Sequence, residues 1–149
     1  MLLHRAAGNV LERMRAQDPR RTWTLEVDTR RTLVDVQPGW LERVIENLVA
    51  NAAKYSGPGK PVLVRIAADP AGVRLEVHDE GPGIPEADLE RVFEPFYRTA
   101  EARQRASGSG LGLAVCRRIV ELMGGEIHAG PRPEGGAVFT FTLPLADAE

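Results

Sequence analysis

Polar side chains at helical spacing are the first feature of this sequence that could do chemistry. Asn47 and Asn51 are four residues apart and Lys54 lies three residues further, so on a helix they share one stripe of an otherwise apolar surface. Asparagine is unfavourable in the middle of a helix. An amide oxygen suits Mg²⁺, and a lysine ammonium is a point charge for a phosphate. The stripe therefore indicates either a water-facing edge or a metal–phosphate site.

A carboxylate followed by glycines is the second feature, in the stretch DEGPGIP from Asp79 to Pro85. Asp79 stands at the end of a predicted strand, where its carboxylate can accept a hydrogen bond from an exocyclic amine. Gly81 and Gly83 let the backbone approach a flat ring closely. Taken alone, the stretch also fits an ordinary turn with a solvated Asp-Glu pair.

A glycine-rich loop, SGSGLGLAV from Ser107, is the third feature. It lacks the lysine and Ser/Thr of a P-loop, and a polar segment precedes it where a dinucleotide fingerprint needs a strand. A glycine turn before a helix offers free backbone N–H groups and a positive dipole end, which favours phosphate. A flexible hinge explains the loop equally well.

A fourth cluster, Phe93, Phe96 and Tyr97 with Arg98, includes at least one phenylalanine that we assign to the core.

These residues must be positioned by elements that the hydrophobic pattern predicts. Period-3.6 patterns predict helices over Leu2–Gln17, Trp40–Tyr55 and Leu111–Met123, with a short helix before FEPFYR. Alternating patterns predict strands at 22–28, 32–36, 61–69, 72–79, 125–130 and 136–145. Strands in adjacent pairs favour an α+β two-layer sandwich over a doubly wound sheet. We expect a mixed, mostly antiparallel sheet of about five strands, packed on three helices.

Composition limits the class of protein. The chain has 149 residues, 43% of them hydrophobic and 27% charged, with a net charge of −2. That length fits one domain, and the charge gives no support to nucleic-acid binding. No apolar run approaches a membrane span, and no signal peptide is apparent. The single cysteine, Cys116, excludes an internal disulfide, and we expect it to be a small apolar filler. We also assign Trp40 and Leu48 to the core and His78 to a strand surface.

Together, in this order, the four features resemble the catalytic ATP-binding domain of bacterial sensor histidine kinases, in the gyrase/chaperone/histidine kinase ATPase superfamily with its Bergerat fold. ENLVANAAKYS is similar to the N box of that family, and DEGPGIP to its first glycine box. FEPFYR is similar to the F box, and GSGLGLAV to the second glycine box. The resemblance covers roughly residues 22–145. It implies a phosphotransferase that uses ATP and Mg²⁺, with a flexible ATP lid before the second glycine box.

The resemblance also implies roles for single residues. Asn51 matches the magnesium ligand, Asn47 the preceding asparagine of the box, Lys54 a phosphate contact, and these three are the expected catalytic group. Asp79 matches the aspartate that reads the adenine amine. The remaining expected nucleotide-binding residues are Tyr55, Gly81, Gly83, Ile84, Arg98, Gly108, Ser109, Gly110, Leu111, Gly112 and Leu113.

One departure bears on the reaction. Superfamily members that hydrolyse ATP carry a glutamate four residues before the magnesium asparagine, where this chain has Asn47. An amide cannot accept a proton from water. Glu46 lies about 100° round the helix from Asn47 and should face elsewhere. We therefore expect phosphoryl transfer with little hydrolysis, in which the protein mainly positions groups and neutralises charge.

A second departure concerns the acceptor. Sensor kinases phosphorylate a histidine on a helical dimerisation domain, and none of His4, His78 and His128 fits the acceptor pattern. We expect residues 1–20 to be the tail of a dimerisation or linker helix, and residues 21–149 to be the catalytic domain. The chain would then be an excised domain, which we favour, or would act in trans. It would be inactive alone, monomeric and cytoplasmic, with any membrane anchor elsewhere in the kinase. Its partners would be the missing dimerisation and histidine phosphotransfer domain and a response regulator receiver domain.

Three alternatives stay open. A serine kinase of the anti-sigma-factor type has the same fold, and would transfer phosphate to serine rather than to histidine. A nucleotide-sensing or scaffold module would bind ATP without transferring it. An α+β domain without a nucleotide site would need all four motifs to be coincidental.

Overall fold

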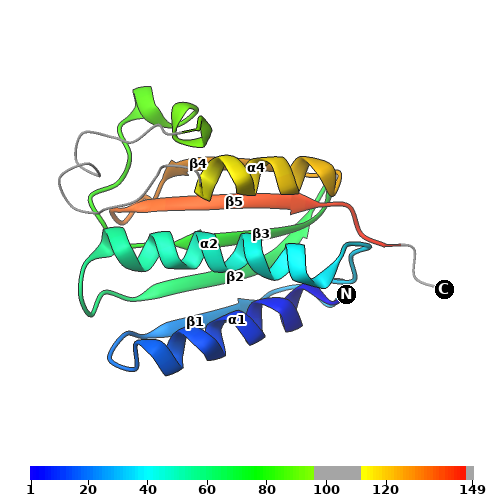
Figure 1. The fold of residues 1–149 in the computed structure, drawn as a ribbon, viewed down its shortest axis with the longest axis horizontal. Helices are drawn as coiled ribbons and strands as arrows, with labels where there is room; N and C mark the ends of the chain where they lie inside the picture. Colours follow the sequence, from blue (N-terminus) through cyan, green and yellow to red (C-terminus); the bar gives the residue numbers. More distant parts are fainter. Residues whose placement is uncertain (96–111, 147–149) are drawn as a thin grey trace.

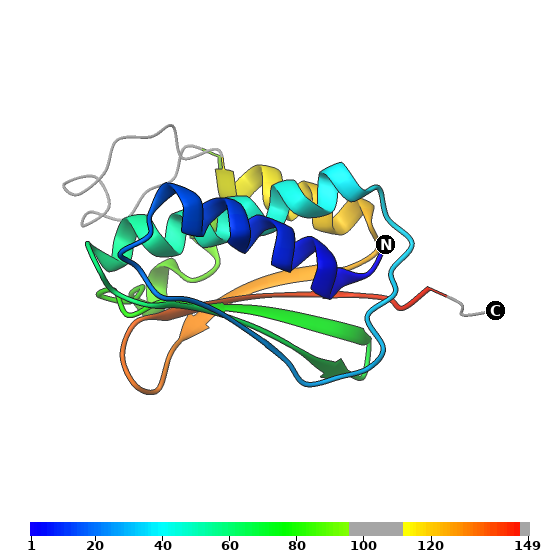
Figure 2. The same ribbon diagram turned by 90° about the horizontal axis from the view of Figure 1, so that it is seen from below.

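One sheet with three helices on a single face makes up the fold of the computed structural model, which describes residues 1–95 and 112–146. The helices are α1 (Leu3–Gln17), α2 (Pro38–Ser56) and α4 (Gly112–Leu122). The strands are β1 (Trp23–Val27), β2 (Val62–Asp69), β3 (Gly72–His78), β4 (Glu126–Pro131) and β5 (Ala137–Leu143). Two 3₁₀ turns, η1 (Glu86–Asp88) and η2 (Arg91–Phe93), stand in place of the predicted short helix. Figures 1 and 2 show the two layers and confirm the predicted α+β sandwich.

The sheet is mixed and mostly antiparallel, as predicted. Its strand order is β1-β2-β3-β5-β4, and β1 with β2 is its parallel pair. The register places Val64 opposite Val77 and Leu75 opposite Phe141. These side chains alternate along their strands toward the helices, because successive residues of a strand point to opposite faces. The central strands β2, β3 and β5 therefore supply one continuous apolar face, on which the helices pack.

The helical layer completes the same core. In α2 the side chains of Leu41, Val44, Ile45 and Leu48 are fully buried, which confirms the apolar stripe and the prediction for Leu48. The prediction that Trp40 belongs to the core is wrong, because this residue is 44% exposed. It lies about 100° round the helix from Leu41, outside the stripe that faces the sheet.

The first helix belongs to this core as well. Figure 2 shows α1 beside α2 on the same side of the sheet. Leu3, Val10 and Leu11 of α1 are fully buried in the single apolar cluster. On the outer surface Arg13 bonds to Glu42 at 2.9 Å and approaches Glu46 at 3.5 Å. The relation of residues 1–20 to an acceptor helix in a longer chain stays a prediction.

The predicted strand at 32–36 is wrong. This segment forms only an isolated bridge between Leu33 and Leu2. Thr32 and Val34 bond to the start of the chain instead: the Leu3 N–H donates to the Thr32 carbonyl, and the Val34 N–H donates to the Met1 carbonyl, each at 2.9 Å. The alternation of buried and exposed side chains is present, but the segment pairs with the first residues of the chain and not with a strand of the sheet.

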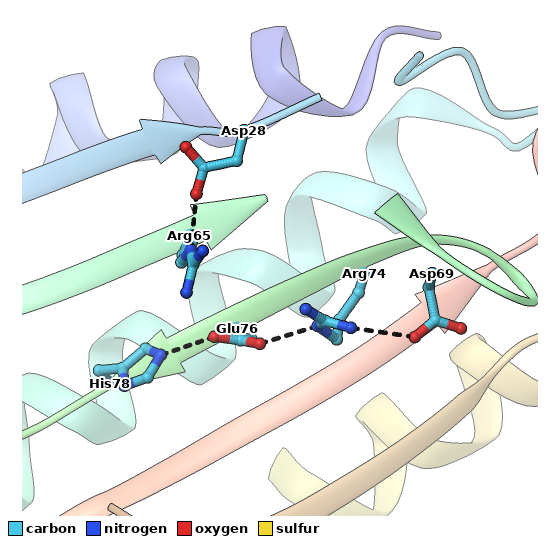
Figure 3. Close-up of polar contacts among 6 residues, drawn as sticks. All are labelled: Asp28, Arg65, Asp69, Arg74, Glu76 and His78. Atoms are coloured by element: carbon cyan, nitrogen blue, oxygen red, sulfur yellow. Dashed lines mark hydrogen bonds and ion pairs between the residues drawn. The ribbon is translucent and has the colours of Figure 1, made fainter. Parts of the chain in front are cut away.

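The other face of the sheet bears charged side chains that are linked by hydrogen bonds and ion pairs (Figure 3). Arg65 bonds to Asp28 at 2.7 Å, and Arg74 bonds to Asp69 at 3.2 Å. Arg74 and His78 both contact Glu76, each at 2.8 Å. Burial opposes the charge of Glu76, but the hydrogen bonds from His78 and Arg74 outweigh it and lower the pKa of this carboxyl group. His78 thus lies on the strand surface, as predicted.

Candidate functional site

Three segments that carry predicted motif residues meet at one end of the molecule, on the left in Figure 1, together with a fourth segment that does not. They are the C-terminal half of α2, the turn after β3, the β4–β5 hairpin and the first turn of α4. The Glu80 N–H donates to the Ser56 hydroxyl at 3.3 Å, which joins the turn after β3 to the end of α2. The Asp79 N–H donates to the Ala137 carbonyl at 3.0 Å, which joins that turn to β5.

Asp79 is a buried carboxylate, with 5% of its surface exposed. Its Oδ1 accepts hydrogen bonds from the N–H of Gly81 at 2.9 Å and the N–H of Ala137 at 3.1 Å. Within residues 1–95 and 112–146, no group donates to Oδ2. Burial raises the pKa of Asp79, although the two backbone donors and the positive charge of Arg132 act against this shift. The site therefore fixes one oxygen and leaves the other as a hydrogen-bond acceptor.

Glycines let the backbone close around this carboxylate. A Cβ on Gly81 would lie 2.7 Å from the Tyr55 carbonyl oxygen, so the turn after β3 rests directly on the end of α2. A Cβ on Gly136, which has φ 101°, would collide with the Asp79 carbonyl oxygen. Gly83, with φ 83°, would bring a Cβ within 3.3 Å of the Gly136 carbonyl oxygen. The two glycine-bearing turns are thus in mutual contact on one side of Asp79.

The polar stripe of α2 divides between two environments. Asn47 is half-buried and turned toward α4: its Oδ1 would lie 3.8 Å from a Cβ on Gly112, and its amide lies near the Cys116 thiol, whose pKa it acts to lower. Asn51 is partly exposed, and Lys54 is exposed with its ammonium 5.9 Å from the centre of the Tyr55 ring. Asn47 therefore faces a neighbouring helix, although its exposure is in the same intermediate class as that of Asn51, and Lys54 is the most exposed of the three.

Ten of the predicted site residues lie within the described part of the chain. Ile84 and Leu113 pack partly buried against the core. The others are Asn47, Asn51, Lys54, Tyr55, Asp79, Gly81, Gly83 and Gly112. Arg98, Gly108, Ser109, Gly110 and Leu111, together with the predicted lid, lie outside the described residues.

Phe93 is buried with its ring edge-on to Phe139, at 6.1 Å between centroids, which confirms that one phenylalanine of the aromatic cluster belongs to the core.

The sequence predicted the two strands β4 and β5 but did not place the hairpin between them in the site. Ala137 and Gly136 contact Asp79 directly, and Arg132 lies close enough to favour its negative charge. The Arg132 Nε is buried and makes no hydrogen bond with any described group. The stretch PRPEGG signals a turn between strands. Nothing in this stretch indicates which other segment the turn contacts, so its contact with Asp79 could be found only from the structure.

Cys116 should be chemically inert in the folded protein. Its side chain is fully buried, and burial raises the pKa of the thiol to about 12, so almost no thiolate exists at neutral pH. We expect a disulfide reagent such as 5,5′-dithiobis(2-nitrobenzoate) to label native protein at pH 8 only slowly, and to label guanidinium-unfolded protein at once. Rapid stoichiometric labelling of the native protein would contradict this burial.

The chain belongs to the family described as histidine kinase-, DNA gyrase B-, and HSP90-like ATPases, whose model matches residues 36–147. Within that family it is similar to the signal transduction histidine-protein kinase AfsQ2 of Streptomyces coelicolor, with 41% identity over 127 residues. This match covers 83% of the chain but 23% of AfsQ2, so the chain spans less than a quarter of that relative.

Solved structures of histidine kinases have the same fold. The mycobacterial sensor histidine kinase MprB is 30% identical with a TM-score of 0.85, covering 99% of this chain and 97% of that one. The histidine kinase ThkA, solved in complex with the response regulator protein TrrA, is 29% identical with a TM-score of 0.76, covering 97% of this chain and 40% of that one. Among the described residues, no helix is both long enough and apolar enough to cross a bilayer.

Proposed function

We propose that this chain is the ATP-binding catalytic domain of a two-component sensor histidine kinase, and that it transfers the γ-phosphoryl group of ATP to a histidine on a dimerisation domain outside the chain. The observation that carries the proposal is the Asp79 carboxylate. It is buried, anchored through Oδ1 and left with Oδ2 as an acceptor, beside glycine turns that pack closely around it. Membership of the ATPase family supports the same conclusion.

Each accessible group then has a part in binding. Oδ2 of Asp79 would accept a hydrogen bond from the adenine amine, which selects adenine over a base with a carbonyl at that position. Tyr55, Gly81, Gly83 and Ile84 would line the base. Lys54, exposed one turn beyond Asn51, would contact the phosphates.

The donor set also fits a magnesium ion held mainly by phosphates. Mg²⁺ commonly keeps one or two protein oxygens together with phosphate oxygens and water. Asn51 offers one such amide oxygen on the accessible part of the stripe. In the described ranges no group of three His, Cys, Asp or Glu side chains could cage a metal. When bound, the ion would neutralise charge on the phosphates during transfer.

The surroundings of Asn47 and Glu46 support transfer rather than hydrolysis. Asn47 has no basic group to accept a proton from water, and its amide is turned toward the first turn of α4. Glu46 points toward α1, where its Oε1 lies 3.5 Å from Arg13. Neither residue is placed to act as a general base on a water molecule beside Asn51.

The partners follow from the same proposal. A dimerisation and histidine phosphotransfer domain would present the acceptor, and a response regulator receiver domain would take the phosphoryl group from it, as the ThkA–TrrA complex supports. The isolated chain would be a monomer, located in the cytoplasm.

Calorimetric titration of ADP and ATP, with and without Mg²⁺, tests the binding step. We expect the Asn51→Ala variant to bind Mg·ATP at least about tenfold more weakly and to lose most of the magnesium dependence, because it removes a metal ligand. Asn9→Ala is the matched control: Asn9 lies on the exposed side of α1, where it makes only a 3.5 Å contact with Glu42. An Asn51→Ala variant with unchanged magnesium dependence would remove Asn51 from the metal site.

A transfer assay then separates the two kinase classes. With a dimerisation domain of a related kinase supplied as acceptor, the label from γ-labelled ATP should be lost in acid and kept in base, as phosphohistidine is. Acid-stable label would favour the serine-kinase alternative. Binding without transfer to any acceptor would favour the nucleotide-sensing module.

A further inference from the structure

A buried arginine outside the family match joins three segments of the chain. Arg21 follows α1, and its side chain is 6% exposed. The guanidinium Nε bonds to Asp18 at 3.0 Å, Nη1 to the Lys60 carbonyl at 2.5 Å and Nη2 to the Ala53 carbonyl at 3.2 Å. It also lies over the Trp23 ring, 5.7 Å from the ring centre. A charge this deeply buried is tolerated only when it is paired and hydrogen-bonded, so the arrangement is specific.

One of these bonds reaches the end of α2 that bears the nucleotide residues. The last four carbonyl groups of a helix have no partner within the helix. Ala53 lies in this last turn, since α2 ends at Ser56. Arg21 supplies the missing donor to its carbonyl oxygen. The next two residues are Lys54 and Tyr55, the proposed contacts for phosphate and base.

The same helical turn touches the Asp79 segment from its other side. The Ser56 hydroxyl accepts the Glu80 N–H, and the Tyr55 carbonyl is in tight contact with Gly81. Gly81 in turn donates to Oδ1 of Asp79. The last turn of α2 is therefore held between Arg21 and the turn that positions the adenine-reading carboxylate.

Another hydrogen bond of Arg21 reaches the end of α1. Asp18 is the residue that caps this helix, and its N–H donates to the Met14 carbonyl at 2.8 Å. Its own carbonyl accepts the Trp23 indole N–H at 3.0 Å. A continuous set of hydrogen bonds and close contacts thus runs from the end of α1 through Arg21 to the end of α2 and on to Asp79.

We propose that Arg21 is a positioning residue of the nucleotide site, and that it couples the end of α1 to the nucleotide-binding end of α2. This inference rests on the proposed binding of adenine nucleotide. Arg21 lies before residue 36, where the family match begins, and it touches none of the predicted ligand residues itself. Its effect on binding would be carried by the Ala53 carbonyl and the helical turn behind it.

Titration of ADP into three variants of the whole chain tests the coupling. Arg21→Met removes all the donors but keeps much of the apolar stem, and should weaken ADP binding at least about fivefold. Arg21→Lys keeps the charge and should recover part of the affinity. Asp18→Asn keeps the shape of the end of α1 but removes its charge, and should weaken binding about two- to threefold. Arg65→Met is the matched control, because Arg65 makes an exposed pair with Asp28 on the other face of the sheet.

A double-mutant cycle distinguishes coupling from general destabilisation. In the Arg21→Met background, Asp18→Asn should have no further effect on the affinity, because the bond between them is already absent. If Arg21→Met does not fold, as judged by circular dichroism, the Asp18→Asn and Arg21→Lys affinities decide. Wild-type affinity in every folded variant would overturn the inference and leave the proposed function intact. Failure of the wild-type protein to bind ADP at millimolar concentration would overturn both.

Discussion

Asp79→Asn should weaken ADP binding about 30- to 100-fold, which corresponds to roughly 2–3 kcal/mol. In the variant, Oδ1 can still accept the N–H groups of Gly81 and Ala137, so the loop geometry is kept. The second position, however, becomes an NH₂ donor. It would face the adenine amine, also a donor, inside a site with little access to water. Calorimetric titration at pH 7.5 measures the loss.

The pH dependence of binding provides the control for this substitution. Burial raises the pKa of Asp79 above its ordinary value of 3.8, so protonation begins at a higher pH than for an exposed aspartate. Protonation of Oδ2 turns this oxygen into an O–H donor, which cannot accept the hydrogen bond of the adenine amine. The affinity of the wild-type protein should therefore fall as the pH drops through this raised pKa. The Asp79→Asn variant, which has no carboxyl group to titrate at this position, should show no such decline. Equal acid sensitivity in both proteins would assign the titration to another group.

The same pKa shift fixes the sign of the effect on folding. Because the pKa of Asp79 is raised in the folded state, ionisation of this group opposes folding. The protonated form therefore favours folding at low pH, and this stabilisation is lost as the pH rises through the folded-state pKa. Removing the charge should therefore cost no more than about 1 kcal/mol at neutral pH. Urea unfolding of the variant would show whether the loss of binding is separate from a loss of stability.

Two adjacent glycines in the β4–β5 hairpin should differ sharply when each is replaced by alanine. Both have positive φ, 105° at Gly135 and 101° at Gly136, so both substitutions carry backbone strain of about 1–2 kcal/mol. A Cβ on Gly135 meets open space, whereas a Cβ on Gly136 collides with the Asp79 carbonyl oxygen. We expect Gly136→Ala to lower the free energy of unfolding by about 3–5 kcal/mol in total. Gly135→Ala should incur the strain alone.

The pair also reports on the site. Gly136→Ala must push Asp79 and the hairpin apart, which should weaken ADP binding in whatever fraction of the variant folds. Gly135→Ala should bind ADP as the wild type does. Urea unfolding curves and ADP titrations of the two variants measure both effects. Equal losses of stability would mean that the hairpin yields without disturbing Asp79.

Much of the fold could be predicted because its elements bury one face each. The alternation in β2, β3 and β5 and the stripe of α2 are strong patterns, and both are confirmed. Two of the failures have a common cause. Residues 32–36 alternate like a strand but pair with the chain's first residues, and Trp40 is apolar but lies outside the stripe. The local hydrophobic pattern indicates which side chains can be buried, but it does not indicate which segment of the chain will pack against them.

In the site, too, residues that are contiguous in sequence could be predicted, whereas contacts between distant segments could not. Asp79, Gly81 and Gly83 could be found because the turn that they form is contiguous in sequence. The donor that fixes Asp79 from the other side is Ala137, 58 residues away, and no local motif marks it. Arg21 was missed for a related reason: an arginine beside Asp18 and Pro19 looks like an exposed loop residue, and its burial depends on carbonyl groups from α2 and the loop before β2.

The burial of α1 makes the unit that folds larger than the segment that the family model matches. The family match begins at residue 36, yet Leu3, Ala6, Ala7, Val10 and Leu11 are fully buried in the one apolar core. A fragment trimmed to the match would expose the surfaces that they cover on α2 and on the sheet, and would also lose β1. The family model and the cooperatively folding unit thus begin at different residues of this chain, and Arg21 lies between the two starting points.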